Sequence, residues 1–501
     1  MSDPIFGIGI TRVDNEPRLA TTGDMAVAGA VGTAPLANAA TFPLNVPVFV
    51  FSDDAAALTA LGTSGTLPDA IRGIQGQLGE FQVAARVVVV RVAPGVDDAA
   101  TMANIIGSPA DKSGIHALPE AGPVLGVVPR LICCPGYTKQ HWRGLTAIVP
   151  GIQGSNLTEA PTITFAGGGT DPGKVLPTAT ATLGTGPDAD KVVGYVITDP
   201  GKNLSGAVTV AFAGGGTDPG KVLPTATAVI EHLANPVVAA LPPVLARLLG
   251  TAVVMGPSTS KQAYDDWRET IQSDAIVPVE TGVKYGVDAS LQDSAPRVIG
   301  LAIRRDHEKG GRPFHSWANQ PIYDIVGPAR PIAFSLTDGS TEGQQILANN
   351  GGIIVRGEAG VETAIASGGF IYIGTDTCAE DPLWRFYNVK RGRDYIHLMF
   401  LKTLRFYLGR FNITGQTIEA ILNTMQFALR DLKANGDILG YKVGFTRDQN
   451  SPENLRLGRF TVDFAAEEPP VLRYIGLRSA RYRPALDALL DDLLTQVDVA
   501  A

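Results

Sequence analysis

The feature that most constrains this fold is an internal duplication. Residues 165–181 read FAGGGTDPGKVLPTATA, and residues 212–228 repeat the same letters 47 positions later. In both copies Thr and Val alternate with small residues, and Gly clusters mark turns, which is typical of short β-strands. Two units this short bury little apolar surface, so they must pack on each other or on a host domain. We therefore expect a small all-β insert of two repeats, period 47, over residues 148–231.

The chain on both sides of this insert alternates strands and helices. Arg86–Val92 is a near-continuous apolar run, the kind that is buried on both faces of a parallel sheet. A helix is expected to open at Leu67, and another is expected over Pro243–Leu249 after the insert. These segments predict one α/β domain made of residues 21–147 and 232–345, with a Rossmann-like layer.

The last third of the chain has a different, α+β pattern. We expect long helices over residues 391–408 and 415–434, then a strand over Arg459–Phe464. The residues after 471 read as an extended segment, and an amphipathic helix over Pro484–Val497 closes the chain. The sequence thus predicts a C-terminal domain over residues 346–501.

Charge and hydropathy exclude two broad classes of protein. The formal net charge is −8, which argues against a general nucleic-acid-binding protein because phosphate neutralisation needs clustered Lys and Arg. No run approaches the roughly 18–20 apolar residues of a membrane span. The N-terminus also lacks the basic start and apolar run of a signal peptide. We expect synthesis in a cytoplasm, no membrane insertion and no direct contact with nucleic acid.

The most tempting catalytic motif lies inside the repeats. Gly168–Lys174 and Gly215–Lys221 both fit the G-x4-G-K pattern of a phosphate-binding loop. Such a loop needs Ser or Thr after the Lys to hold Mg²⁺, and Val175 and Val222 stand there instead. A Pro two residues further on blocks the helix that should follow. The pattern indicates a repeated turn and not a nucleotide site.

Other chemistry is equally hard to find in the sequence. The six histidines form no H-x-x-x-H pair for a metal, and no G-x-S-x-G elbow is present. We therefore expect no catalytic residues, no metal ligands and no cofactor. The odd number of cysteines leaves two readings open, namely buried free thiols or an inter-subunit disulfide formed by one of them. The candidates are Cys133, Cys134 and Cys378.

One charge feature rises above background in the C-terminal third. Between residues 382 and 410 there is a single acid, Asp394, against seven basic residues. The stretch is either a solvated basic helix face or a docking strip for an acidic partner surface in a larger assembly. The seven residues are Arg385, Lys390, Arg391, Arg393, Lys402, Arg405 and Arg410.

Five short motifs outside the insert carry a resemblance to a known family. They are GAVGTAP at 29–35, FPLNVPV at 42–48, ANQPI at 318–322, DPLWRFYNV at 381–389 and RFTV at 459–462. With these motifs the chain resembles the contractile tail sheath proteins of myophages, tailocins and related injection systems. The resemblance covers roughly residues 21–147 and 232–490 and leaves the duplicated insert outside.

The resemblance implies a structural subunit and not an enzyme. Such subunits stack as hexameric rings around a tail tube protein, meet baseplate and tail terminator proteins, and contract to drive the tube through a host envelope. It further implies assembly in the host bacterial cytoplasm, a place in the virion tail, an inner C-terminal domain and variable outer domains. From the residue patterns alone, a static decoration protein or adhesin and a Rossmann-type enzyme with an inserted domain are the alternatives.

The resemblance also assigns roles to particular residues. Residues 1–20 and about 471–480 would be arms that add strands to neighbouring sheets. In the first arm the apolar contacts would come from Ile5, Ile8, Ile10 and Val13. The basic helix would face the tube through Lys390, Arg391, Arg393, Lys402, Arg405 and Arg410.

Overall fold

The computed structural model describes residues 24–79, 84–358, 360–361, 365–366 and 368–499. The chain divides into two units, Met1–Pro469 and Pro470–Ala501, each of which is described by itself. The expected N-terminal arm residues Ile5, Ile8, Ile10 and Val13 lie outside the described residues.

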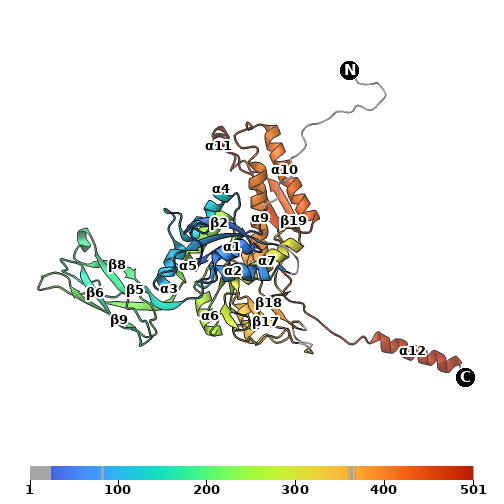
Figure 1. Ribbon diagram of the computed structural model, residues 1–501, viewed down its shortest axis with the longest axis horizontal. Coiled ribbons are helices and arrows are strands. Elements are labelled where there is room, and N and C mark those ends of the chain that lie inside the picture. The colour runs from blue at the N-terminus through green and yellow to red at the C-terminus, as the bar shows by residue number, and fades with distance from the viewer. Residues whose placement is uncertain (1–23, 80–83, 359, 362–364, 367, 500–501) are drawn as a thin grey trace, which may run out of the picture. The chain divides into compact units, whose positions relative to one another are not determined.

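A six-stranded sheet forms the centre of the first unit, with the strand order β12-β11-β4-β1-β3-β2 (Figure 1). All neighbouring pairs are parallel except β2–β3. Because successive residues of a strand point to opposite faces, Val87 and Val89 of β3 pack on one side of the sheet while Val88 and Val90 pack on the other. The strands are β1 (Ala28–Thr33), β2 (Pro47–Phe51), β3 (Arg86–Val92), β4 (Leu131–Cys133), β11 (Thr251–Met255) and β12 (Ile276–Val279).

Helices cover both faces of this sheet, so that two hydrophobic clusters lie on either side of it. One face carries α1 (Ala55–Leu61), α2 (Leu67–Gly76) and α7 (Ala295–Glu308). The other face carries α3 (Asp98–Ile106), the 3₁₀ helix η2 (Gly114–Glu120), α4 (Ala121–Leu125), α5 (Pro236–Leu248) and α6 (Lys261–Arg268). The expectation that this layer is Rossmann-like and forms the outer part of the subunit stays a prediction.

Two small sheets accompany the central sheet, and one of them contains strands that follow residue 346. The strand β15 (Gln320–Pro321) pairs with β18 (Phe370–Ile373), which pairs with β17 (Ile353–Arg356), and α8 (Glu342–Ala348) packs nearby. A second small sheet holds β13 (Val283–Tyr285), β14 (Ser290–Gln292) and β16 (Gly327–Pro328). Ile353 and Ile354 belong to the two cores of the central sheet. The predicted domain boundary at residue 346 therefore does not coincide with a boundary between hydrophobic clusters.

The duplicated segment folds as a small β module. Its first and last strands, β5 (Trp142–Pro150) and β10 (Ala226–Leu233), pair with each other and connect it to the central sheet. The other four form a sheet in the order β8-β7-β6-β9. These strands are β6 (Pro161–Gly167), β7 (Thr178–Leu183), β8 (Val192–Asp199) and β9 (Val208–Gly214).

The C-terminal lobe, as we name residues 387–467, has a hydrophobic cluster of its own. It contains α9 (Tyr387–Leu404), α10 (Gly415–Ala434), β19 (Gly440–Gly444), α11 (Pro452–Arg456) and β20 (Asp463–Glu467). Leu429 of α10 and Ile396 of α9 are fully buried in this cluster. The side chain of Thr414 accepts a hydrogen bond from the backbone N–H of Thr417, which caps α10 where the chain turns into it.

The second unit is an extended segment followed by one helix. Residues 470–483 form neither helix nor strand, and α12 (Pro484–Val499) follows them. The leucines of α12 are exposed, so the described side chains of this unit form no apolar core.

Candidate functional site

The two-stranded sheet of the C-terminal lobe consists of two edge strands, although the carbonyl of Ala466 on β20 accepts a hydrogen bond from Arg393 at 2.6 Å. The strand β19 pairs with β20 in antiparallel register from Gly440–Glu467 to Gly444–Asp463, and among the described strands neither has a second neighbour. A strand edge presents a row of free N–H and C=O groups that another chain can pair with. This sheet is therefore a candidate site for strand addition.

Three of the predicted tube-facing residues are held inside the subunit. Lys390 Nζ lies 2.5 Å from Asp394 Oδ2, four residues along the same helix. Arg393 forms a forked pair with Glu468, with Nε–Oε1 and Nη2–Oε2 distances of 2.8 and 2.9 Å. Arg391 is the most deeply buried of the three, with 1% of its side chain exposed.

The Arg391 guanidinium joins three distant parts of the chain. Its Nη1 and Nη2 donate to the carboxylate of Asp306 on α7 at 3.1 and 2.5 Å, and Nη2 also donates to the carbonyl of Met25 at 3.3 Å. The same guanidinium lies 5.1 Å from the ring of Trp317, which stacks on Tyr387 at 3.8 Å. Burial raises the pKa of Asp306, and Arg391 opposes that shift. The pair fixes the C-terminal lobe to the central layer and is not available to a partner surface.

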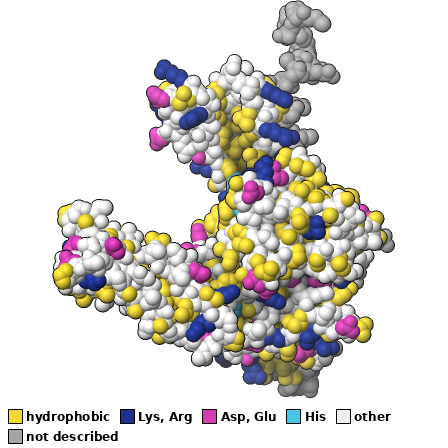
Figure 2. Space-filling model, turned by 60° about the vertical axis from the view of Figure 1, so that its left-hand side comes forward, with side chains coloured by type: hydrophobic (Ala, Val, Ile, Leu, Met, Phe, Trp, Pro, Cys, Tyr) yellow, Lys and Arg dark blue, Asp and Glu magenta, His cyan; other side chains and the backbone are white. Residues whose placement is uncertain are grey.

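The other three basic residues are at least partly accessible. Arg405 and Arg410 are exposed, and Arg410 lies over the ring of Phe406 at 5.2 Å. Lys402 is half-buried, and this burial lowers its pKa. The positive charges of Arg130 and Arg405 lower the pKa further. Figure 2 shows a band of apolar side chains down the C-terminal lobe, at the top of the view, with Lys and Arg side chains beside it. The accessible members of the predicted tube-facing set are therefore Lys402, Arg405 and Arg410.

The three cysteines are buried and carry no disulfide. Burial raises the pKa of Cys134 and of Cys378 to about 12, and it also raises the pKa of Cys133 well above its usual value. A thiol reacts as its thiolate and only where an oxidised partner can reach it. An inter-subunit disulfide through any of them requires a subunit conformation other than this one, and non-reducing gels of assembled particles test for it.

The lysines of the two G-x4-G-K turns point into their own loops. Lys174 Nζ donates to the carbonyls of Gly167 and Gly169 at 3.0 and 2.7 Å, and Lys221 Nζ donates to that of Gly216 at 2.6 Å. A phosphate-binding loop instead aims its backbone N–H groups and its lysine at the phosphates. These loops present carbonyl oxygens to the lysine, which agrees with the reading of a repeated turn.

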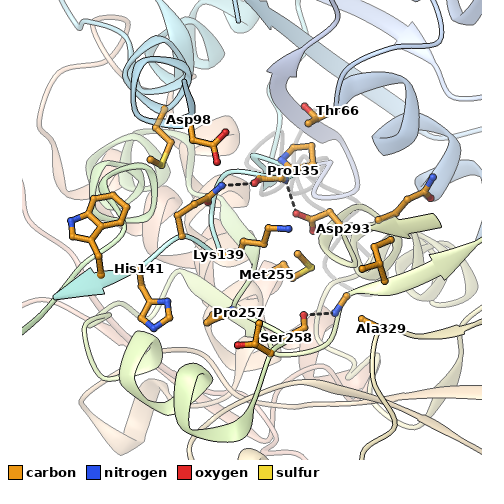
Figure 3. A pocket seen from close by; sticks show the side chains of 18 of the residues that line it. Thr66, Asp98, Pro135, Lys139, His141, Met255, Pro257, Ser258, Asp293 and Ala329 are labelled. Atoms are coloured by element: carbon orange, nitrogen blue, oxygen red, sulfur yellow. Dashed lines mark hydrogen bonds between the residues drawn. The ribbon is translucent and has the colours of Figure 1, made fainter. Parts of the chain in front are cut away.

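A cavity of about 970 Å³ lies beyond the ends of β4 and β11 (Figure 3). Ligands of open α/β sheets bind in this kind of place. Here Asp293 accepts hydrogen bonds from the backbone N–H groups of Gly136 and Ala295 at 2.7 and 2.8 Å. Ser258 Oγ bridges the carbonyl of Glu280 and the N–H of Gly282. Both side chains hold loops together at the edge of this cavity.

Sequence patterns missed the acidic partners of the basic helix. Asp306 lies 85 positions before Arg391, and Glu468 lies 75 positions after Arg393. Only the helical spacing of Lys390 and Asp394 carried a usable signal. The described residues contain no cluster of three or more possible metal ligands, and none of their helices has the length and hydropathy of a membrane span.

Comparisons with known proteins point to one kind of assembly. A scan against protein-family profiles gives no match. The tail sheath protein of Escherichia phage P2 is 22% identical over 99% of this chain and 100% of its own length. The major tail sheath protein of Serratia phage KSP20 is 38% identical over 24% of this chain and 30% of its own.

Solved structures share the fold at low sequence identity. The contracted sheath complex of the extracellular contractile injection system PVC aligns with 97% of this chain and 99% of its own, at a TM-score of 0.56 and 11% identity. The contracted helical sheath of the anti-feeding prophage aligns with 96% of this chain and 100% of its own, at 0.54 and 12%.

Proposed function

We propose that this chain, which belongs to the tail sheath protein family, is a structural subunit of a contractile tail sheath. The observation that carries the proposal is the alignment with the phage P2 sheath protein over essentially the whole length of both chains. Neither the static decoration protein nor the Rossmann-type enzyme is favoured by the relatives.

Subunits join by strand addition at the C-terminal lobe. Neither β19 nor β20 has a second strand neighbour among the described residues, and residues 471–480 are extended. Backbone pairing at an edge gives affinity without demanding a particular sequence. The arm of one subunit pairs with this sheet in a neighbour, and residues 1–20 act as the second arm.

The assembled particle consists of stacked hexameric rings around a tail tube. Lys402, Arg405 and Arg410 form the strip that faces an acidic tube surface, because they are the more accessible members of the basic set, whereas Arg391 is buried. The stack meets baseplate and tail terminator proteins at its ends and is assembled in the host cytoplasm as part of a virion tail. The duplicated β module lies on its outer surface.

Contraction is a cooperative passage between two packings of the same subunit. The arms act as hinges while each subunit body moves as a unit. The buried Arg391–Asp306 pair supports this division, since it fixes the C-terminal lobe to the central layer. No nucleotide is needed if the extended packing is a kinetic trap set during assembly.

Electron microscopy of the purified chain tests this function. We expect long hollow polymers or stacked rings. Monodisperse monomers alone, even with tube protein present, would contradict the proposal. Deleting residues 1–20 should leave a folded subunit that does not polymerise, and normal polymers from that variant would refute the arm assignment.

A further inference from the structure

The helix α12 carries an apolar face that nothing in its own unit covers. Leu486, Leu490 and Leu493 recur at helical spacing and are 63%, 58% and 48% exposed. Isolated helices of this length are marginal in water, and an uncovered leucine face is normally a binding face. The helix therefore calls for a partner surface outside this unit.

The charge of α12 defines the chemistry of that partner. The helix contains Asp487, Asp491 and Asp492, and from Pro484 onward the chain has no Lys or Arg. Acidic amphipathic helices are repelled by anionic lipid surfaces and by nucleic acid. A basic protein surface with exposed apolar side chains is the complementary match.

The C-terminal lobe offers such a surface at the end of its two-stranded sheet. Phe445 directly follows β19, and its ring meets that of Phe460 edge-on at 5.5 Å. Phe445 and Leu457 are 50% and 69% exposed. Three exposed arginines, together with the exposed acids Asp448 and Glu453, surround them in the sequence, so that basic residues are in excess. We call this surface the hairpin tip, which consists of Phe445, Leu457, Arg447, Arg456 and Arg459.

We propose that α12 of one subunit docks on the hairpin tip of a second copy of this chain. This inference rests on the proposed function, in which residues 471–480 pair with the β19–β20 sheet of a neighbour. With residues 471–480 lying along the sheet, residues 481–483 add about 10 Å, at roughly 3.3 Å per residue, so an arm that runs toward the end of β19 brings α12 to the adjoining tip. The leucine face covers Phe445 and Leu457, and the aspartates lie against the arginines.

A cysteine cross-link tests the contact in the full-length chain. Leu490→Cys and Leu457→Cys are combined in one chain, and the polymer is oxidised and run on a non-reducing gel. Since the three native cysteines are buried, the unsubstituted chain serves as the background control. We expect a ladder of covalent oligomers from the double variant, and at most a trace from either single variant.

A charge exchange tests the specificity of the same contact. Asp487→Lys with Asp491→Lys should raise the concentration needed for polymerisation by about tenfold, equivalent to about 1.4 kcal/mol. Adding Arg456→Asp and Arg459→Asp to that variant should restore it. Glu159→Lys, at an exposed acid of the duplicated β module, is the control for charge reversal away from the tip and should change little.

The outcomes separate this inference from the proposed function. Polymers without a ladder, and without any effect of charge reversal, would overturn the docking of α12 and leave the sheath assignment intact. Cross-links from Leu490→Cys to tube protein would overturn it in favour of a different partner. Failure of the unsubstituted chain to polymerise would count against the sheath function itself.

Discussion

The duplicated β module and the C-terminal region differ in where their backbone groups find hydrogen-bond partners. In the module the two repeats close each other: Ser155 pairs with Val222, and 47 positions along, Lys202 pairs with Val175. In the C-terminal lobe the β19–β20 sheet has no third strand among the described residues. The module's turns thus find their partners within the chain, although β8 and β9 are still edge strands of its sheet, whereas we expect the β19–β20 sheet to gain a third strand from a second molecule. Assembly should therefore depend on the open region and be indifferent to the closed one.

Side-chain contacts in the module follow the same exchange. Asn156 Nδ2 donates to the carbonyl of Gly220 at 3.0 Å, and Asn203 Nδ2 donates to that of Gly173 at 3.3 Å. Both asparagines have φ of 55°, a left-handed conformation that Asn tolerates better than most residues. The turn of each repeat is thus held by the opening of the other, which explains why neither repeat needs a large core of its own.

The largest effect is expected at the attachment of the C-terminal lobe. Arg391→Met leaves the Asp306 carboxylate buried without its partner, and unpairing of this kind costs about 3–5 kcal/mol. Urea unfolding of the subunit measures the loss. Arg410→Met, at an exposed position, is the matched control and should cost less than about 0.5 kcal/mol.

A second substitution sharpens that result. Adding Asp306→Leu to Arg391→Met removes the orphaned charge and should recover part of the stability. If Arg391→Met behaved like the surface control, the pair would not be what fixes the lobe to the central layer.

The contacts exchanged between the repeats predict two losses of stability that are equal to each other and of intermediate size. Asn156→Ala and Asn203→Ala should each destabilise the module by about 1–2 kcal/mol, because each removes a hydrogen bond and the left-handed preference of Asn. Asn156→Gly and Asn203→Gly keep the conformation and should cost less. Clearly unequal losses would break the symmetry argument. Hydrogen exchange of the module's backbone amides, measured in the full-length chain, reports the free energy of unfolding of the module.

A smaller, pH-dependent effect is expected where the module joins the central layer. Burial lowers the pKa of His141, and the charge of His232 lowers it further, whereas the negative charge of Asp266 raises it. Because the folded pKa lies below the unfolded value of about 6.5, the unfolded state takes up protons first and stability is lost as pH falls below that value. His141→Gln should lose less stability than the parent chain between pH 7 and 5. An equal or greater loss would contradict this assignment.

The smallest effect is expected from removing the module. Deleting residues 151–225 and joining Pro150 to Ala226 through Asn-Gly keeps the paired ends of β5 and β10, since these two residues face each other in register. Electron microscopy should show polymers like those of the parent chain. Loss of ring formation would mean that the module takes part in assembly.

Regular patterns were predictable from the sequence and long-range partners were not. The expected helices over 391–408 and 415–434 are found as Tyr387–Leu404 and Gly415–Ala434, because apolar periodicity marks helices of this length well. The helix expected over Pro243–Leu249 begins earlier, at Pro236, where Asn235 caps it. The prolines inside that helix concealed its true start.

The candidate site divides in the same way. The exposed residues Arg405 and Arg410 could be singled out from charge alone, yet so could the buried Arg391. Its burial depends on Asp306 and Met25, whose proximity arises only when distant elements pack together. The letters of the duplication likewise predicted two repeats that pack on each other or on a host domain, but they did not show which residues make the contacts.

Truncation after Pro469 tests the contrast between the closed and open regions most directly. The full chain and the truncated chain are compared by electron microscopy at equal concentration, with thermal unfolding to establish that both are folded. We predict hollow polymers or stacked rings from the full chain and only folded monomers from the truncated one. Normal polymers from the truncated chain would contradict the claim that assembly depends on the open terminal region.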